Sequence, residues 1–330
     1  MSTISPWRLC VAPMMEWTDR HFRWLLRQIT QQARLYTEMV TAMAIRHGDV
    51  ERLLAFSPCE HPIALQLGGS DPALLAFAAR AGEAYHYDEI NLNVGCPSPR
   101  VSSGRFGACL MKEPSLVAEC VQAMREVVAI PVTVKTRIGV DDIDSYDALT
   151  HLMERIQHAG CDVVIVHARK AWLQGLSPKE NREIPPIQYD TVYRLKQDFP
   201  EMTFVLNGGI QTHAAVEQHL IQVDGVMLGR VAYAKPMWFS GVDRLWFGEG
   251  LAAITDPMVV QAYLDYMHEQ LGLGVPLRAM SKHLMGFFQG VPGAREWRRK
   301  VGEKAKTPAD WQKFLGSVDI CQSLRCVNDL

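Results

Sequence analysis

The sequence contains 330 residues, of which 48% are apolar, 21% are charged and 8% are aromatic. This composition is typical of globular proteins that bury a large core, and it excludes a disordered or fibrous chain. The 34 Lys and Arg residues nearly balance the 36 Asp and Glu residues, so the net charge of −2 does not by itself indicate a nucleic acid partner.

Short apolar runs alternate with helical patterns through the first two thirds of the chain. Eight of these runs are predicted strands: Arg8–Met14, Leu35–Met39, Ile63–Leu67, Glu89–Asn93, Val132–Arg137, Val163–His167, Phe204–Asn207 and Val226–Leu228. The segments between them carry helix signals, such as the prolines that begin 72–85 and 114–128. Repeated strand and helix units predict a parallel α/β fold, and eight of them form a (β/α)8 TIM barrel more readily than an open sheet.

The strand pattern ends after Arg230. An aromatic and glycine-bearing connector follows over 238–250, and helical periodicity then continues over 256–271, 277–288 and 308–324. We therefore expect a catalytic barrel over 1–240, a connector over 241–254, and a small all-helical C-terminal domain over 255–330.

The chain lacks the marks of a membrane or secreted protein. No apolar run is long enough to cross a bilayer, and Met1–Arg8 has no secretory pattern, so we expect a cytoplasmic protein without a membrane partner. The eight cysteines include no C-x-x-C pair, which argues against a zinc site or a disulfide scaffold. We expect Cys10, Cys109, Cys120 and Cys161 to be small buried side chains.

Polar residues recur where the predicted strands end. They are Glu16, Gln66, Asn91, Asn93, Lys135, Arg137, His167 and Asn207. Any one of them is as readily explained by a structural role in the core or at the rim. In a βα barrel, however, the carboxyl ends of all strands meet at one mouth, so their agreement favours a shared site there.

Glycines end the last two predicted strands. Asn207-Gly208-Gly209 and Gly229-Arg230 each lead into a predicted helix. Glycines let backbone amides approach an anion, and loops after strands seven and eight are the usual phosphate site of this fold. The pair therefore favours a phosphorylated ligand over two ordinary turns, with Arg230 as a counter-charge.

Lys135 has two competing roles. Beside an electron-rich heterocycle, a lysine ammonium stabilises negative charge, as is needed near N1 of a reduced flavin. With a depressed pKa, Lys135 would instead form a Schiff base. The residues alone leave both roles open.

Cys96 lies on a loop between Gly95 and Pro97, just after a predicted strand. A thiol in this position can donate a proton to a bound ligand. The alternative is a thiolate nucleophile with a histidine base. That role leaves only His167 as its partner at the mouth and does not explain the phosphate loops.

The C-terminal region has a local excess of positive charge. Between Val291 and Lys306, six basic residues face only Glu296 and Glu303: Arg295, Arg298, Arg299, Lys300, Lys304 and Lys306. A solvated charged face is the commoner explanation of such a run, and a nucleic acid surface is the alternative.

Taken together, these blocks resemble the tRNA-dihydrouridine synthase family. The matching blocks are Ala12-Pro13-Met14-Met15, Gln66-Leu67, Asn93-Val94-Gly95-Cys96-Pro97, Lys135-Thr136-Arg137, Val166-His167-Ala168-Arg169, Asn207-Gly208-Gly209 and Gly229-Arg230. They follow the family's order, cover the barrel and show no departure from its pattern. Residues 179–186 and the basic helix around Arg295 and Arg298 resemble the A-type subfamily, which acts on U20 and U20a in the D-loop of tRNA.

The resemblance implies an FMN-dependent reduction of uridine to 5,6-dihydrouridine, with NADPH, or else NADH, as the electron source. FMN would be held by Pro13, Met14, Met15, Gln66, Lys135, His167, Asn207, Gly208, Gly209, Gly229 and Arg230. Hydride would pass from flavin N5 to uracil C6, and Cys96 would give its proton to C5. Asn93 and Arg182 would orient the flipped-out base, and Lys179, Arg295 and Arg298 would contact tRNA. No metal and no obligate protein partner are expected.

Three other functions remain as alternatives. Another FMN barrel oxidoreductase with a small substrate would keep the phosphate loops and Lys135 but would not need the basic tail. A flavin-free lyase or isomerase would use Lys135 as a Schiff base and would be colourless. An RNA-binding protein with an inactive barrel would bind tRNA without oxidising NADPH.

Overall fold

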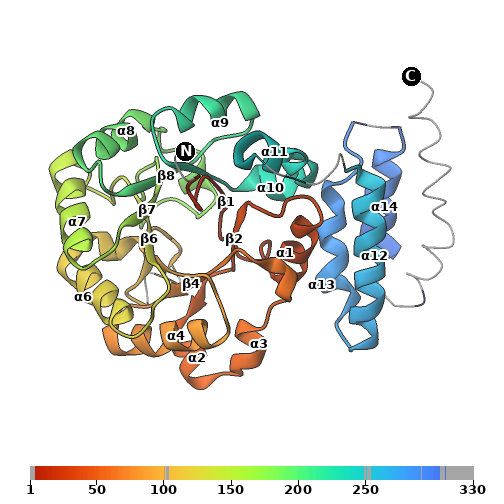
Figure 1. Ribbon diagram of the computed structural model, residues 1–330, viewed down its shortest axis with the longest axis horizontal. Helices are drawn as coiled ribbons and strands as arrows, with labels where there is room; N and C mark the ends of the chain where they lie inside the picture. Colours follow the sequence, from red (N-terminus) through yellow and green to blue (C-terminus); the bar gives the residue numbers. More distant parts are fainter. Residues whose placement is uncertain are drawn as a thin grey trace. The chain divides into compact units, whose positions relative to one another are not determined.

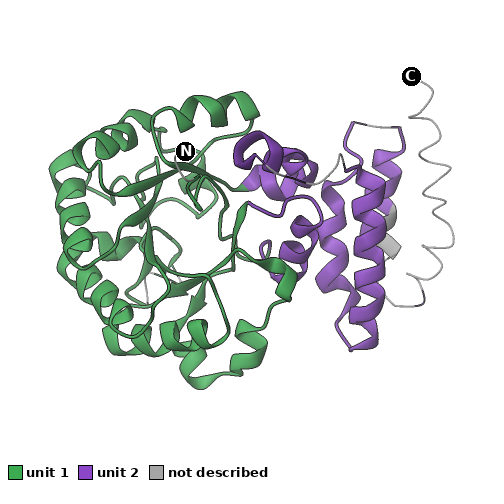
Figure 2. Ribbon diagram, in the orientation of Figure 1, with its two compact units in different colours: residues 1–16, 33–229 green, residues 17–32, 230–330 purple. Residues whose placement is uncertain are grey.

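The computed structural model describes residues 4–99, 101, 104–248, 250, 254–290, 292–304 and 309. The chain divides into two compact units (Figure 2). Unit 1 consists of residues 1–16 and 33–229, and unit 2 consists of residues 17–32 and 230–330. This division differs from the predicted domain limits in two places, because 17–32 and 230–240 group with the C-terminal helices.

Parallel strands form the centre of unit 1 (Figure 1). They are β1 (Leu9–Val11), β2 (Arg34–Tyr36), β3 (Val40–Thr41), β4 (Ile63–Gly68), β5 (Glu89–Asn93), β6 (Val132–Arg137), β7 (Val163–His167), β8 (Thr203–Asn207) and β9 (Gly225–Leu228). The sheet runs in the order β2-β1-β9-β8-β7-β6-β5-β4-β3, and β2 also pairs with β4. That pairing closes eight strands into a ring, which confirms the predicted TIM barrel. The two-residue strand β3 was not predicted.

Helices surround this ring. They are α2 (Ala42–His47), α3 (Val50–Leu54), α4 (Pro72–Ala84), α6 (Pro114–Arg125), α7 (Tyr146–His158), α8 (Tyr189–Asp198) and α9 (His213–Leu220), with short 3-10 turns η1 (Pro58–Glu60), η2 (Gly107–Lys112) and η3 (Glu180–Arg182). Asp71, Ser145 and Thr212 cap α4, α7 and α9 by accepting hydrogen bonds from backbone N–H groups. Such caps satisfy amides that the first helical turn leaves without a partner.

Alternation along each strand divides the barrel interior into an apolar and a polar part. A buried apolar cluster contains Cys10, Ala12, Tyr36, Ala64, Val163, Ile165, Val205 and Met227. Farther along β4, β7 and β8, toward their carboxyl ends, the inward positions become polar, and the inward positions of β5 and β6 are polar from the start of each strand. The apolar part stabilises the barrel, at about 1.5–3 kcal/mol for each large side chain that is fully buried, and the polar part is available for chemistry.

Unit 2 is helical in the residues that the structure describes. It contains α1 (Arg20–Arg27), α10 (Arg230–Ala234), η4 (Pro236–Phe239), α11 (Val242–Phe247), α12 (Asp256–Gly272), α13 (Leu277–Ser281), η5 (Lys282–Gly286) and α14 (Ala294–Lys304). The predicted helix over 308–324 lies outside the described residues, except for Ala309.

Asp19 explains why the segment 17–32 belongs to unit 2. It caps α1, and it also accepts hydrogen bonds from Lys282 and His283 at 2.7 and 2.9 Å. Burial opposes its ionisation, but these partners hold the pKa of Asp19 well below its usual range. Trp24 stacks on Tyr266 of α12, with ring centroids 4.2 Å apart. Polar and aromatic contacts thus join α1 to the C-terminal helices.

Two predicted features of this region differ from the structure. The expected connector over 241–254 contains helix α11. The expected helix over 277–288 is instead α13 followed by the 3-10 turn η5, which ends at Gly286. A Cβ at Gly286 would lie 2.9 Å from the carbonyl oxygen of Tyr233, so the close approach of another segment ends the helical pattern there. Among the described residues, no helix combines the length and apolar character needed to cross a membrane.

Candidate active site

Strand register brings the predicted polar side chains of β4 to β8 to the carboxyl end of the barrel. Gln66 pairs with Asn91, and Asn93 pairs with Lys135. Arg137 pairs with His167, which in turn pairs with Asn207. Because these pairs run through the adjacent strands β4 to β8, their side chains face a single mouth, as the strand-end pattern predicts.

Asn93 organises the loop that carries Cys96. Its side-chain oxygen accepts hydrogen bonds from the backbone N–H groups of Gly95 and Cys96, at 3.1 and 3.0 Å. The Cys96 carbonyl accepts a bond from Ala108 N at 2.9 Å. Gly107, with φ at 77°, allows this approach, since a Cβ there would lie 2.6 Å from the Cys96 oxygen. These contacts fix the backbone on both sides of a half-buried thiol.

Arg137 connects three loop segments by hydrogen bonds from inside the barrel. Its Nε donates to the carbonyl of Gly95 at 3.0 Å, and its NH1 donates to the carbonyls of Lys170 and Asn181 at 3.1 and 2.9 Å. The side chain is buried. The strand-end pattern in the sequence includes Arg137 but predicts no role for it. Its position two residues after Lys135 on the same strand was the available signal.

Lys135 is held toward the end of β8. Its Nζ donates to Asn207 Oδ1 at 3.1 Å, and Asn207 in turn donates to the carbonyl of Met227 at 2.8 Å. Burial, followed by the neighbouring Arg137, lowers the pKa of Lys135 to about 7, and Cys96 opposes the shift. A lysine in this state gains its full charge only when an electron-rich group lies beside it.

Cations gather around this lysine. Burial, followed by Arg137, Lys135, Arg169 and Arg182, lowers the pKa of His167 well below its usual value. Burial also lowers the pKa of Arg137 to about 10, and Arg182 and Arg169 act in the same direction. The carboxylates of the described residues do not figure among the causes of these shifts. The field at the mouth therefore favours an anionic ligand.

The glycines after β8 form a tight turn that only glycine fits. Gly208 and Gly209 have φ angles of 123° and 69°, and a Cβ at Gly208 would lie 2.8 Å from a ring carbon of His167. The hydroxyl of Tyr189 donates to the Gly208 carbonyl at 2.8 Å. Helix α9 follows, capped by Thr212. This is the arrangement expected of a backbone anion site.

The first strand ends beside the last. Ala12 N donates to the carbonyl of Leu228 at 2.7 Å, and a Cβ at Gly229 would lie 3.8 Å from both Ala12 Cβ and Met14 Sδ. Pro13 and Met14 are half-buried, and Met15 is exposed. Arg230 is exposed and begins α10 in unit 2.

The loop after β7 presents two exposed basic side chains, Lys179 just before η3 and Arg182 as its last residue. The buried Asn181 between them holds this loop in place. Its side chain accepts from Trp172 N at 2.7 Å and donates to the Trp172 carbonyl at 2.9 Å. The sequence does not predict this structural role of Asn181, because a single polar residue within a charged segment carries no periodic signal.

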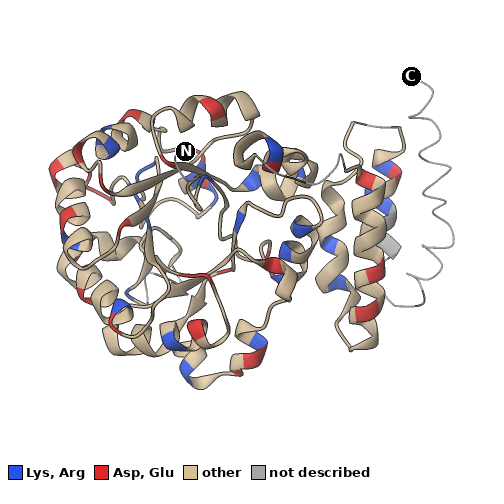
Figure 3. Ribbon diagram, viewed as in Figure 1, with Lys and Arg blue, Asp and Glu red and all other residues tan. Residues whose placement is uncertain are grey.

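Arg295 and Arg298 lie on α14 in unit 2 and are exposed. Figure 3 shows in blue where Lys and Arg occur along the helices of this unit. Ala294, Trp297 and Val301 of the same helix are buried. Trp297 Nε1 donates to the carbonyl of Leu284 at 3.0 Å. The two arginines are three residues apart and share one face.

A separate pocket of about 570 Å³ lies over α7 and α8 and includes Tyr146, Lys170, Trp172 and Arg194. None of the predicted site residues lines it. Among the residues that the structure describes, no group of three or more His, Cys, Asp and Glu side chains is arranged to hold a metal ion.

Comparison with known proteins gives the family of this chain. A model of the dihydrouridine synthase (Dus) family matches residues 10–322. The tRNA-dihydrouridine(20/20a) synthase of Synechocystis sp. is 55% identical over 325 residues, which cover 96% of this chain and 97% of the relative. The protein of the same name from Escherichia coli (strain K12) is 55% identical over 305 residues, 92% of this chain and 88% of the relative. The protein of the same name from Yersinia pestis is 53% identical over 302 residues, which cover 91% of this chain and 87% of the relative. The chain therefore belongs to the dihydrouridine synthase family and is an enzyme of that family.

Proposed function

We propose that this protein reduces uridine to 5,6-dihydrouridine at positions 20 and 20a in the D-loop of tRNA, with FMN as its cofactor and NADPH, or else NADH, as the reductant. The names of the relatives support the substrate and the positions. The observation that carries the proposal is the position of Cys96 on a loop held by Asn93, at the same mouth as the half-buried Lys135. A tRNA substrate implies a cytoplasmic location, and the reaction needs no membrane and no obligate protein partner.

The residues at the mouth fit a flavin mononucleotide. The glycine turn at Gly208 and Gly209 is suited to its phosphate, together with Gly229 and Arg230. Lys135, Gln66, Asn207 and His167 supply donors for a heterocycle that becomes electron-rich, and Pro13, Met14 and Met15 would complete the binding site. When bound, FMN supplies hydride from N5 to uracil C6.

Lys135 matches this assignment through its electrostatics. Burial, and after it the neighbouring Arg137, disfavour its charged form, with the pKa at about 7. An electron-rich ring beside Nζ would favour the charged form, so binding and protonation of this lysine support each other. Asn207 keeps Nζ directed along the mouth by accepting its hydrogen bond at 3.1 Å.

Cys96 is the proton donor in this proposal. After C6 receives hydride, the electron pair of the 5,6 double bond takes up a proton at C5, and the Cys96 S–H bond supplies it. The thiolate that remains is stabilised by the cationic surroundings and regains a proton from water. Because the side chain is half-buried, water reaches it once the product leaves.

Basic side chains would hold the RNA. A uridine must leave its stack to enter a barrel mouth, and the rest of the tRNA is then held largely through its phosphates. Asn93 and Arg182 would orient the flipped-out base, while the exposed Lys179, Arg295 and Arg298 would contact the tRNA backbone.

The test is an assay of the purified protein with NADPH and tRNA that lacks its modifications. We expect uridines 20 and 20a to lose their ultraviolet absorbance, as mapped by sequencing of the product. The Cys96→Ala variant should keep its flavin but lose about 10²- to 10⁴-fold in turnover, the usual contribution of a general acid. NADPH oxidation without dihydrouridine, or full turnover by Cys96→Ala, would contradict the proposal.

A further inference from the structure

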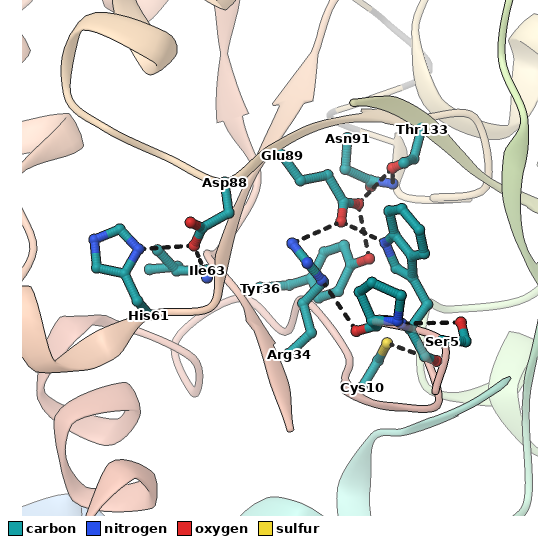
Figure 4. Close-up of polar contacts among 12 residues, drawn as sticks. Ser5, Cys10, Arg34, Tyr36, His61, Ile63, Asp88, Glu89, Asn91 and Thr133 are labelled. Atoms are coloured by element: carbon teal, nitrogen blue, oxygen red, sulfur yellow. Dashed lines mark hydrogen bonds and ion pairs between the residues drawn. The ribbon is translucent and has the colours of Figure 1, made fainter. Parts of the chain in front are cut away.

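A line of buried hydrogen bonds joins Glu89, at the start of β5, to the loop that carries Cys96. The first two links are Thr133, which donates to Glu89 at 2.5 Å, and Asn91, which donates to Thr133 at 2.7 Å. Gln66 then donates to Asn91, and Asn93 donates to Gln66, both at 2.8 Å. Finally, the backbone N–H groups of Gly95 and Cys96 donate to Asn93 at 3.1 and 3.0 Å. Figure 4 shows its first two links. We call this line the Glu89 chain.

The lower end of the Glu89 chain is Glu89 itself, at the start of β5, and it can only accept hydrogen bonds. Besides Thr133, Glu89 receives the indole N–H of Trp7 at 2.7 Å and the hydroxyl of Tyr36 at 2.8 Å, and Arg34 lies 3.3 Å away as an ion pair. The indole of Trp7 and the guanidinium of Arg34 can only donate, and Arg34 is the counter-ion of the Glu89 carboxyl group. Because the Thr133 oxygen accepts the hydrogen bond from Asn91, its own proton is directed to Glu89.

The upper end of the Glu89 chain consists of the backbone N–H groups of the Cys96 loop, which can only donate hydrogen bonds. Backbone N–H groups at Gly95 and Cys96 require an oxygen opposite them, so Asn93 must present Oδ1 and not its NH2 group. The groups between the two ends both donate and accept. Their direction is therefore set by the ends, and both ends require the same direction.

Because the Glu89 chain is buried, every side-chain amide in it must keep this hydrogen-bond direction. Glu89, Asn91 and Thr133 are fully buried, and Gln66 and Asn93 are 2% and 8% exposed. Water has little access to replace a lost partner, so turning any one amide over would set donor against donor. Each side chain thus fixes the orientation of the next.

We propose that Glu89 and Thr133 are positioning residues for the proton donor. They act through Asn91 and Gln66 on the amide of Asn93, which in turn fixes the backbone of Cys96. This inference rests on the proposed role of Cys96. It assigns a function in the reaction to a carboxylate and a hydroxyl that lie below the site and touch neither cofactor nor substrate.

Thr133→Val tests the proposal, because it keeps the shape of the side chain and removes the hydroxyl. We expect kcat for dihydrouridine formation to fall about 10- to 100-fold, as for a misplaced catalytic group, with KM for tRNA and flavin content unchanged. Thr133→Ser, which restores the hydroxyl, should recover most of the turnover. Asn91→Leu, which breaks the next link, gives an independent second variant.

Tyr36→Phe is the matched control. It also removes a hydroxyl that donates to Glu89, but that hydroxyl is not part of the line to Asn93. If loss of a bond to Glu89 only weakens the fold, then Tyr36→Phe and Thr133→Val should behave alike. Our proposal expects Tyr36→Phe to keep wild-type turnover.

Hydrogen exchange gives a readout besides activity. In Thr133→Val, the amide hydrogens of Gly95 and Cys96 should exchange about tenfold faster than in the wild type, which corresponds to one net hydrogen bond lost. In Tyr36→Phe they should exchange at the wild-type rate. Unchanged exchange at these amides in both Thr133→Val and Asn91→Leu would overturn the proposal.

A double variant separates this inference from the proposed function. In a Cys96→Ala background, Thr133→Val should reduce turnover no further, because no proton donor is left to position. Full turnover by Cys96→Ala alone would refute the proton-donor role itself. Low turnover by Cys96→Ala, together with wild-type kcat in Thr133→Val, would refute only the Glu89 chain.

Discussion

The two ends of the barrel interior both bury charge, but only one of them balances it. At the lower end, Glu89 accepts three hydrogen bonds and forms an ion pair with Arg34 (Figure 4). Burial opposes the charge of Arg34, but Glu89 raises the pKa of that residue above its usual value. At the upper end, burial and mutual repulsion lower the pKa values of Lys135, Arg137 and His167.

The charges at the lower end therefore serve the fold, and those at the upper end serve ligand binding. In a balanced buried pair, removing one partner leaves the other charge without compensation and destabilises the fold. A cluster of like charges reduces stability, and a protein retains one where a ligand of opposite charge will complete it. Three substitutions test this comparison, in order of decreasing expected effect.

Arg34→Met should break the balance at the lower end. It leaves the Glu89 carboxylate buried without its cation, and we expect a loss of about 3–5 kcal/mol in the free energy of unfolding. The urea unfolding midpoint measures this loss. The double variant Arg34→Met/Glu89→Gln should recover part of it. A loss below about 1 kcal/mol in Arg34→Met would show that the pair does not stabilise the barrel.

Lys135→Met should act in the opposite direction at the upper end. With its pKa at about 7, folded Lys135 has lost the proton that the unfolded chain retains up to its ordinary pKa of 10.5. Stability contributed by this residue therefore increases with pH between these values, and at pH 7 the charged form opposes folding. In flavin-depleted protein, Lys135→Met should melt at least about 2 °C above the wild type at pH 7.

That advantage should shrink as the pH is raised toward 10, and the same variant should bind FMN more weakly than the wild type. A difference in melting temperature that is independent of pH would contradict the depressed pKa. Flavin content, read from the visible absorbance, is the second measurement. Gain of stability together with loss of cofactor would distinguish this lysine from Arg34.

Arg298→Glu extends the comparison to exposed charge on α14. It should leave stability and flavin content unchanged and weaken tRNA binding, reducing the slope of log affinity against log salt by about one phosphate contact. Arg155→Glu, at an exposed position on α7 with no proposed RNA contact, is the matched control. Equal tRNA affinity in wild type and Arg298→Glu would make the basic face of α14 an ordinary solvated surface.

Family membership decides between the alternatives that the sequence left open. Residues 10–322 match the dihydrouridine synthase family, which removes a flavin-free lyase and a protein with an inactive barrel from consideration. The relatives also match over nearly their whole length, including the region of the basic helix. The roles of individual residues at the site remain proposals for the experiments above.

Periodic patterns in the sequence predicted the barrel well. The predicted limits of β5, β6 and β7 agree with the structure residue for residue. β7 is a continuous apolar run, as is typical of strands buried on both faces, and apolar and polar residues alternate in β5 and through most of β6. The polar residues at the strand ends also lie at one mouth, since parallel strands place their carboxyl ends together.

Other features depend on segments that are distant in sequence. The helix expected over 277–288 stops at Gly286 because other backbone atoms approach it there. Segment 17–32 joins the C-terminal helices through Asp19, a contact that no local pattern announces.

The sequence by itself determined the strand order, the polar mouth and the loop that carries Cys96, because these follow from local periodicity and from the rule that parallel strands end at one edge. Only the tertiary structure decided how buried polar groups pair. Glu89, Asn91 and Asn93 alternate visibly along one strand, but Thr133 and Gln66 come from its two neighbours. Hydrogen bonds between strands depend on register, and register is known only once the barrel has closed.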